Sequence, residues 1–309
     1  MMQRRGPHDV AASLQARLRN VAKTRNVEFQ TILSEFAIER LLYRLGVSPY
    51  QNQFVLKGAM LFRLWTPQRG RATWDLDLLG RSGRTVEDVV SIVSALCSMP
   101  GDDAIEFDVD SVRGEIIRAA DEEGGVRVRL VARVGNVRIP MQLDVGFGDI
   151  VTPHDDLVTY PTLLDQPAPK ILAYPRDTVV AEKLQAIVSL GVKTSRMKDF
   201  YDVRVLAWSF PFDGVVLASA IRATFTNRGT PIPAEEPVVL TEDFFGSAGR
   251  QTQWRAFLKR GRLDGPSDGA SLSSDLRLFV APILTGLAAE GEFSGSWSPG
   301  GPWLRTSTD

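Results

Sequence analysis

Residues 54–80, FVLKGAMLFRLWTPQRGRATWDLDLLG, constrain the fold most, because the spacing of their apolar side chains changes twice. Three apolar residues at 54–56 predict a short strand. Apolar residues within 60–65 follow helical spacing and predict a helix of about two turns. Proline and glycine then interrupt the helix, and alternating residues at 74–79 predict a second strand. We therefore expect a strand, a short helix and a second strand in one unit.

Two acidic residues of the second strand define a candidate site. Asp75 and Asp77 lie two positions apart, so their side chains point to the same face. Neighbouring carboxylates repel each other and need a cation or a basic cluster. Their oxygens suit Mg²⁺, which takes other ligands from water and substrate phosphates. Gly58, at the strand-to-helix junction, adds backbone N–H groups for an anion. An exposed strand face would give the same Asp pattern without a metal.

The composition excludes several other kinds of site. Cys97 is the only cysteine of the 309 residues, so neither an intrachain disulfide nor a thiolate metal cage is expected. His8 and His154 are too few for a histidine zinc site. The net charge of -1 gives no overall attraction to nucleic acid, so such contact would need a local patch. No apolar run of membrane length is apparent, so we expect a cytoplasmic protein without a membrane partner.

We expect an α+β fold, with a mixed sheet flanked by helices and an appended C-terminal helical region. The segment 152–176 is rich in proline and is interpreted as a covering loop or linker. The expected domains are an N-terminal helical brace at 1–52, a core at 53–165, a C-terminal helical domain at 166–290 and a flexible tail at 291–309.

Further polar residues lie on other predicted elements. Asp144 follows strand alternation within 137–145 and becomes a third carboxylate of the site if this strand lies beside that of Asp77; otherwise it is a surface aspartate. Lys183 lies near the apolar seam of a helix, either snorkelling or pointing into a site that needs a cation. Asp199 and Asp202 are three apart on the next helix, and therefore neighbours.

The segment 252–262, TQWRAFLKRGR, is basic and contains two aromatic residues. Such a segment is suited to bind a phosphate backbone. A plain amphipathic surface helix is the alternative.

Several ordered motifs over about residues 30–210 resemble one family. They are LKGAMLFRLW followed by RATWDLDLL, then MQLDVGFGD, AEKLQAI and MKDFYDVRVL. Together they resemble the AbiEii/AbiGii (MenT-like) nucleotidyltransferase toxins of the DNA-polymerase-β-like superfamily. The resemblance implies a minimal nucleotidyltransferase sheet and Mg²⁺-dependent transfer from an NTP, an EC 2.7.7-type activity. It also implies an RNA acceptor, the 3′ end of tRNA, and a cognate antitoxin.

The resemblance assigns roles in the first part of the chain. Lys57 and Gly58 correspond to the phosphate-binding turn, in which Ala59 replaces the usual serine and removes a hydroxyl worth about 1 kcal/mol in hydrogen bonding. Asp75 and Asp77 correspond to the metal-binding pair.

The remaining assignments follow in the same way. Lys183 resembles the lysine that contacts the nucleotide phosphates, and Asp199 resembles the late catalytic acid, with Asp202 beside it. Asp144 matches the superfamily's third carboxylate loosely. Arg71 is expected to pair with the carboxylates or to reach the triphosphate.

The mechanism expected is an in-line displacement at the α-phosphorus with two Mg²⁺ ions held by Asp75 and Asp77. Lys183 would add positive charge at the phosphates, and Asp199 or Asp144 would position the metal or accept the proton. Two alternatives stay open. One is a D-x-D metal-dependent glycosyltransferase, and the other is a non-catalytic nucleotide- or RNA-binding homologue, suggested by Ala59.

Overall fold

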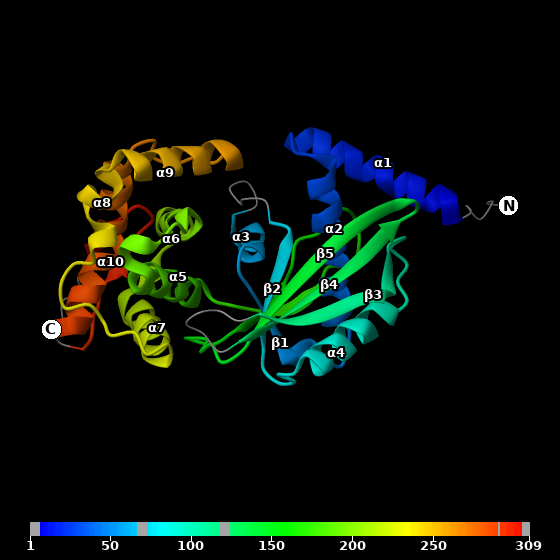
Figure 1. Ribbon diagram of the computed structural model, residues 1–309, viewed down its shortest axis with the longest axis horizontal. Helices are drawn as coiled ribbons and strands as arrows, with labels where there is room; N and C mark the ends of the chain where they lie inside the picture. The colour runs from blue at the N-terminus through cyan, green and yellow to red at the C-terminus, as the bar shows by residue number, and fades with distance from the viewer. Residues whose placement is uncertain (1–6, 67–72, 118–123, 290, 305–309) are drawn as a thin grey trace. The chain divides into compact units, whose positions relative to one another are not determined.

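The computed structural model describes residues 7–66, 73–117, 124–289 and 291–304 (Figure 1). The chain forms two compact units. The first contains residues 1–148 and 156–173, and the second contains 149–155 and 174–309. The chain thus leaves the first unit, returns to it and leaves again.

The first unit is built on a mixed sheet, as the sequence predicts. Among the described residues, seven strands pair in the order β3-β4-β5-β2-β1-β7-β6. The β2–β5 and β1–β7 pairs are parallel, and the others are antiparallel. The strands are β1 (Phe54–Lys57), β2 (Asp75–Gly80), β3 (Glu106–Ile117), β4 (Gly125–Val134), β5 (Val137–Gly146), β6 (Asp156–Thr159) and β7 (Lys170–Ala173).

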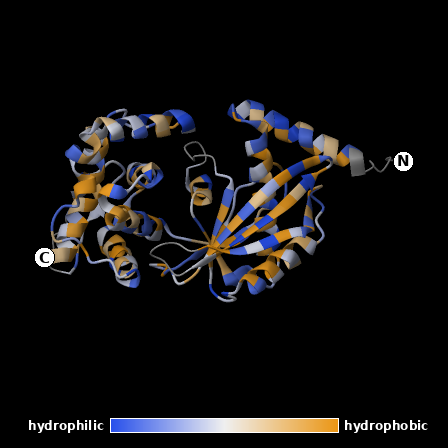
Figure 2. Ribbon diagram, viewed as in Figure 1, coloured by the Kyte–Doolittle hydropathy of each residue, from blue (hydrophilic) through white to orange (hydrophobic). Residues whose placement is uncertain are grey.

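Alternation along β4 and β5 separates an apolar face of the sheet from a polar one. Every second residue is buried, from Val126 to Val134 in β4 and from Ile139 to Val145 in β5. Figure 2 shows this pattern as alternating colours along the strands. The hairpin turns at Gly135, whose φ of +57° favours glycine. Two alternating runs joined at Gly135-Asn136 are the sequence signal for such a hairpin.

Helices pack against the sheet of the first unit. Helix α2 packs against β5 and β7, α4 packs against β3 and β4, and α1 packs against α2. Thr85 caps α4 by accepting a hydrogen bond from the backbone N–H of Asp88 at 3.1 Å. The helices are α1 (Pro7–Arg25), α2 (Phe29–Gly46), α3 (Met60–Trp65) and α4 (Val86–Ser98), with a 3₁₀ turn at Gln51–Gln53.

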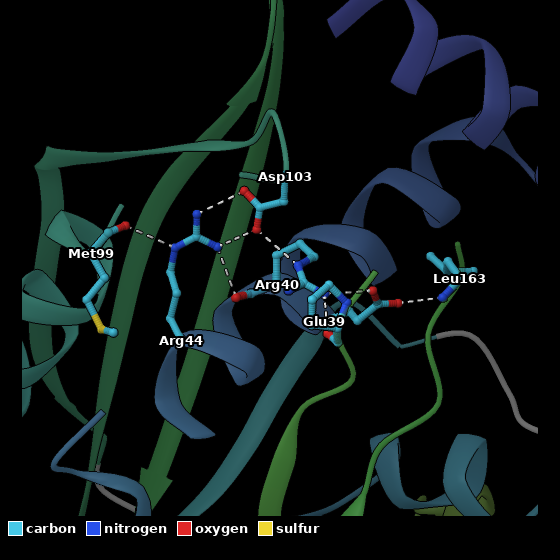
Figure 3. Close-up of polar contacts among 7 residues, drawn as sticks. Glu39, Arg40, Arg44, Met99, Asp103 and Leu163 are labelled. Atoms are coloured by element: carbon cyan, nitrogen blue, oxygen red, sulfur yellow. Dashed lines mark hydrogen bonds and ion pairs between the residues drawn. The ribbon is translucent and has the colours of Figure 1, made fainter. Parts of the chain in front are cut away.

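A buried ionic network fixes α2 within this unit (Figure 3). Arg40 donates to Asp103 at 3.0 Å, and Arg44 donates to both oxygens of Asp103 at 2.8 and 3.1 Å. Glu39 accepts from the backbone N–H of Leu163 at 2.7 Å. Burial raises the pKa of Glu39, whereas for Asp103 the two arginines outweigh burial and lower the pKa. Because two arginines face two carboxylates, the charges balance.

The proline-rich segment differs from the predicted loop. It contains β6 and β7, and Leu172 of β7 pairs in parallel with Val55 of β1. These strands have only four residues each. They depend on the sheet edge for their hydrogen bonds, which a local pattern does not reveal.

The second unit is mainly helical, as predicted. Helix α5 packs against α6 and α7, and α10 contacts α6, α7 and α8. The helices are α5 (Arg176–Leu190), α6 (Met197–Ser209), α7 (Gly214–Asn227), α8 (Glu242–Gly246), α9 (Ala248–Gly261) and α10 (Gly269–Ala289), with 3₁₀ turns at Gly191–Lys193 and Val238–Leu240. A small sheet has the order β10-β9-β8, from β8 (Phe212–Asp213), β9 (Ser296–Trp297) and β10 (Trp303–Leu304).

Residues 291–304 differ from the expected flexible tail. Trp297 is buried, donates to the carbonyl of Ala207 at 2.6 Å and lies with its ring 4.9 Å from that of Phe279. Trp303 stacks on Phe279 at 5.8 Å. The tryptophans therefore anchor a segment whose glycine, serine and proline content suggested flexibility.

Helix α10 meets the length and composition of a membrane span, with a mean hydropathy of 1.3 over its most apolar window. This corrects the expectation that no segment is apolar enough. Its buried residues include Leu276, Phe279 and Ile283, and its charged Asp275 pairs with Arg204 of α6 at 2.6 Å. Packing inside the second unit accounts for the apolar face of the helix.

Candidate active site

Gly58 and Asp77 lie directly against each other in the first unit. Gly58 follows β1 with a φ of +73°, and a Cβ built on it would lie 2.1 Å from Oδ2 of Asp77. The preceding residue, Lys57, pairs with Asp77 across the antiparallel β1–β2 ladder. The turn and the carboxylate are thus held together by strand register. Only glycine leaves room for the Asp77 side chain there.

The register of β2 and β5 brings three acidic residues to one part of the sheet. Asp77 pairs with Asp144, and Asp75 pairs with Gln142. Partnered residues of neighbouring strands share a face, so Asp75, Asp77 and Asp144 project to the same side. Their strand neighbours Leu76 and Leu143 are buried on the opposite side. The adjacency that the sequence left open for Asp144 is therefore present.

Arg127 of β4 holds Asp144. Its guanidinium donates to the two carboxylate oxygens at 2.8 and 2.7 Å. The hydrogen bond to Asp144 raises the pKa of Arg127, and the charges of Asp144 and Asp75 add to the effect. Gln142 also donates to Asp144 at 3.4 Å. Both carboxylate oxygens of Asp144 accept hydrogen bonds from Arg127. A carboxylate that served only as a third metal ligand would not be paired in this way.

The donor set fits a Mg²⁺ ion with few protein ligands. Among the described residues, no group of three or more His, Cys, Asp or Glu side chains is arranged to hold a metal. Asp75 and Asp77 supply two carboxylates on one strand face. Mg²⁺ commonly binds through one or two carboxylates and completes its shell with water and substrate phosphates. Asp75 and Asp77 would therefore hold the ion.

Ala59 and Arg71 complete the predicted residues of the first unit. Ala59 is buried and precedes α3 without a side-chain capping hydrogen bond. A serine at this position would place its hydroxyl at the start of α3. Arg71 lies outside the described residues.

A second group of predicted residues lies in the second unit. The Nζ atom of Lys183 on α5 is 3.0 Å from Oδ1 of Asp199 and 2.7 Å from Oδ2 of Asp202, both on α6. Arg196 adds an ion pair to Asp199 at 2.6 Å. The Lys183 side chain is only 12% exposed, and the two aspartates are almost fully buried. The lysine therefore joins two helices through a buried charge cluster.

The cluster controls the ionisation of Asp199. Burial alone would raise its pKa, but the charges of Lys183 and Arg196 lower it below the ordinary value. Asp199 is therefore held as an anion. An ionised pair of this kind can tie helices together, and it can also present a lysine and a carboxylate to a ligand.

The sequence also matches a protein-family model. The model for the nucleotidyl transferase AbiEii toxin of type IV toxin–antitoxin systems matches residues 40–277, more than half of the chain. The chain belongs to this family. AbiEii membership establishes a nucleotidyltransferase of a toxin–antitoxin system and implies an antitoxin as its functional partner. The resemblance seen in the motifs is confirmed.

Solved structures similar to this AbiEii protein include two from Helicobacter pylori. JHP933 is 15% identical, with a TM-score of 0.49 over 85% of this chain and 95% of its own. A proposed nucleotidyltransferase is also 15% identical, with a TM-score of 0.46 over 86% of this chain and 100% of its own. A search of curated proteins finds no match.

Arg127 is the residue of this AbiEii site that sequence reasoning missed. It lies in the alternating run that predicts β4, on the polar face of that strand. Counting outward from the Gly135 turn pairs it with Asp144. The pairing of Arg127 with Asp144 could therefore have been predicted from the hairpin pattern and its register.

Proposed function

We propose that this AbiEii protein transfers a nucleotide from an NTP to an RNA acceptor, with Mg²⁺ as cofactor and the 3′ end of tRNA as the expected acceptor. The proposal includes action as a toxin in the cytoplasm. The observation that carries it is the contact of the Gly58 turn with Asp77, beside Asp75 on the same strand face. Family membership supports the class of reaction.

Each residue of the first unit has a defined task. Asp75 and Asp77 would hold two Mg²⁺ ions, which supply charge neutralisation at the reacting phosphate and lower the pKa of the acceptor hydroxyl. Backbone N–H groups of the turn from Lys57 to Ala59 would bind phosphate oxygens. Arg127 fixes the carboxylate of Asp144, so that a full negative charge does not stand unpaired beside Asp77.

The residues of the second unit are assigned by the family resemblance alone. Lys183 would bind the nucleotide phosphates, and Asp199 would position the metal or accept the proton from the acceptor hydroxyl. Asp202 shares Lys183 with Asp199 and would keep the lysine oriented.

The decisive experiment incubates the pure protein with each labelled NTP, Mg²⁺ and total RNA. We expect label from one NTP or a subset to enter an RNA species, and EDTA to abolish the transfer. Asp77→Asn should remove transfer and leave the fold intact. The matched control is Asp110→Asn, which changes an exposed aspartate of β3 in the same sheet. Transfer by the Asp77 variant at the wild-type rate would reject the assignment.

Two alternatives are tested alongside. The same incubation with labelled sugar nucleotides in place of NTPs tests for a D-x-D glycosyltransferase, which would transfer label from the sugar nucleotide. A non-catalytic module is favoured by Ala59, which lacks the side-chain hydrogen bond to phosphate that serine would offer. Calorimetry separates a module that binds only RNA, because a nucleotidyltransferase should bind NTP with metal and such a module should not. A homologue that binds nucleotide without catalysis would bind NTP and transfer no label.

A further inference from the structure

Helix α9 has the most one-sided charge of the described helices. It contains four basic residues, Arg250, Arg255, Lys259 and Arg260, and no carboxylate. The chain as a whole has a net charge of -1. The basic residues are therefore a local feature, which the proposed chemistry does not use.

The helix separates its charges from its packing face. Trp254 and Leu258, one turn apart, are buried. Arg255, Lys259 and Arg260 are exposed to solvent. We call these three side chains the α9 basic face. Arg255 and Lys259 are four residues apart and therefore adjacent on the helix surface, about 6 Å apart along its axis.

The cations of the α9 basic face form no ion pair with a described carboxylate, although the charge of Arg255 adds weakly to the hydrogen bonds of Ser271 that lower the pKa of exposed Asp268. None of the three has a carboxylate oxygen within 4.0 Å of a side-chain nitrogen. Elsewhere in the second unit, Arg204 pairs with Asp275 and Arg277 pairs with Glu236, at 2.6 and 2.5 Å. Like charges at positions four apart destabilise a helix by about 0.2–0.5 kcal/mol. The face therefore retains a repulsion that a bound polyanion would relieve.

Structural roles account for part of the basic character only. Arg250 donates to the backbone carbonyls of Val192 and Thr194 and fixes the start of the helix. Lys259 and Arg260 lie in the last turn, where the helix dipole favours cations by about 0.3–1 kcal/mol. Arg255 lies in the middle of the helix, where neither reason applies. Its side chain contacts Gln251, a neutral residue of the same helix, at 2.7 Å.

Helix α1 is also basic, but its charges are used differently. Arg17 pairs with Asp165 at 3.7 Å and Arg25 pairs with Glu35 at 3.5 Å. Its first turn contains Asp9. Two of the four cations of α1, Arg17 and Arg25, thus already have acidic partners, whereas among the described residues no cation of the α9 basic face forms an ion pair.

We propose that the α9 basic face binds the phosphate backbone of the RNA acceptor. The occupant follows from charge, because three exposed cations within two turns of one helix suit a chain of phosphates. The aromatic ring of Phe257 stacks on Trp254 at 5.7 Å and is part of an internal cluster. Base stacking is therefore not expected, and recognition is independent of base sequence. RNA as the polyanion rests on the proposed function, although binding is measured apart from catalysis.

The test measures binding of fluorescent tRNA to the full chain, without NTP, across a salt series. In the variant Arg255→Gln/Lys259→Gln/Arg260→Gln we expect the Kd to rise about tenfold or more at low salt. The slope of log K against log salt should fall by about 2 for a single strand or 3 for a duplex. In transfer assays the KM for RNA should rise, with the KM for NTP unchanged.

Two control variants isolate the face. Lys23→Gln/Lys170→Gln/Arg222→Gln removes three exposed cations from α1, β7 and α7 and matches the change in net charge; it should bind RNA as the wild type does. Arg255→Lys/Lys259→Arg/Arg260→Lys keeps the charge and should also bind. Thermal unfolding establishes that each variant is folded, and Arg255→Gln alone provides a milder change.

Three results would overturn the proposal. The first is an unchanged Kd and salt slope in the glutamine variant. The second is an equal loss in the scattered control, which would indicate net charge alone. The third is unchanged RNA binding with lost binding of labelled polyglutamate, which would assign the face to an acidic protein. If the face binds RNA but no nucleotide is transferred, the proposed function fails and this inference stands.

Discussion

The side chain of Asp77 occupies the position that a Cβ on Gly58 would take: such a Cβ would lie 2.1 Å from Oδ2 of the aspartate. Because Lys57 and Asp77 are cross-strand partners, neither residue can move away without breaking the ladder between β1 and β2. The glycine thus does more than permit a turn. It determines where the carboxylate lies.

Gly58→Ala is therefore expected to displace the Asp77 carboxylate. Transfer should fall on the order of 100-fold, because a displacement of about 1 Å in a catalytic group has effects of this size. The backbone at φ +73° should add about 1–2 kcal/mol of destabilisation. Single-turnover transfer and denaturant unfolding measure the two effects separately.

Gly83→Ala is the matched control. Gly83 also has a positive φ, +66°, but its Cβ would lie 3.1 Å from the Cβ of Asp88, away from Asp77. It should lose similar stability and keep its activity. Equal loss of activity in both variants would indicate that backbone strain, and not displacement of Asp77, is responsible.

Much of the sheet was predictable because its signals are local. The alternation of β2 fixed the shared face of Asp75 and Asp77, and the turn at Gly135 fixed the β4–β5 hairpin. The parallel pairing of Asp77 with Asp144 was only conditional, since strands far apart in sequence leave no mark of their register.

Other features depend on contacts that a local pattern does not contain. Strands β6 and β7 form on the sheet edge, and Trp297 orders a segment of flexible composition by packing on Phe279. From its own residues, the sequence predicted Lys183 near an apolar seam, either snorkelling or pointing into a site that needs a cation, and did not predict its contact with Asp199 and Asp202. Its partners come from the next helix, so their approach depends on how α5 packs against α6.

Ala59→Ser tests the departure from the family pattern. The added hydroxyl lies at the start of α3, where it would offer phosphate a hydrogen bond worth about 1 kcal/mol. We expect the KM for NTP to fall about fivefold with kcat little changed. Steady-state kinetics check this, and an unchanged KM would mean that phosphate does not bind at this turn.

Arg127→Met should lower kcat/KM about 10- to 100-fold, because a hydrogen bond to a charged group contributes about 1.5–3 kcal/mol. The substitution leaves Asp144 charged beside Asp77 without its guanidinium. Adding Asp144→Asn removes that charge, so the double variant should recover part of the activity. The coupling free energy in this cycle is expected at about 0.5–3 kcal/mol. Additive effects would contradict a role through Asp144.

Arg129→Met is the control for this cycle. Arg129 lies on the same strand and pairs with Glu115 at 2.7 Å, but both side chains are more than half exposed. Exposed pairs contribute about 0–1 kcal/mol. Its substitution should therefore leave transfer nearly unchanged.

Lys183→Met should destabilise the second unit by about 3–5 kcal/mol, because it leaves two buried aspartates without their lysine. Lys183→Met/Asp199→Asn/Asp202→Asn removes all three charges and should regain most of that stability. If the neutral variant is stable and still inactive, the cluster of Lys183, Asp199 and Asp202 has a role in transfer beyond joining the helices. Lys193→Met, an exposed lysine in the turn after α5, should change stability by less than about 0.5 kcal/mol.

The lowered pKa of Asp199 predicts how stability depends on pH. Its pKa in the folded protein lies below the ordinary value of 3.8. The unfolded chain therefore binds a proton first as pH falls, so the stabilisation by ionised Asp199 is complete above that value and is lost below it. The free energy of unfolding of the wild type minus that of Asp199→Asn should be constant near neutral pH and shrink as the pH falls through 3.8. Urea unfolding of both proteins across this range measures the difference, in which the other acidic groups cancel. A difference that grows on acidification would mean that Asp199 is protonated in the folded protein.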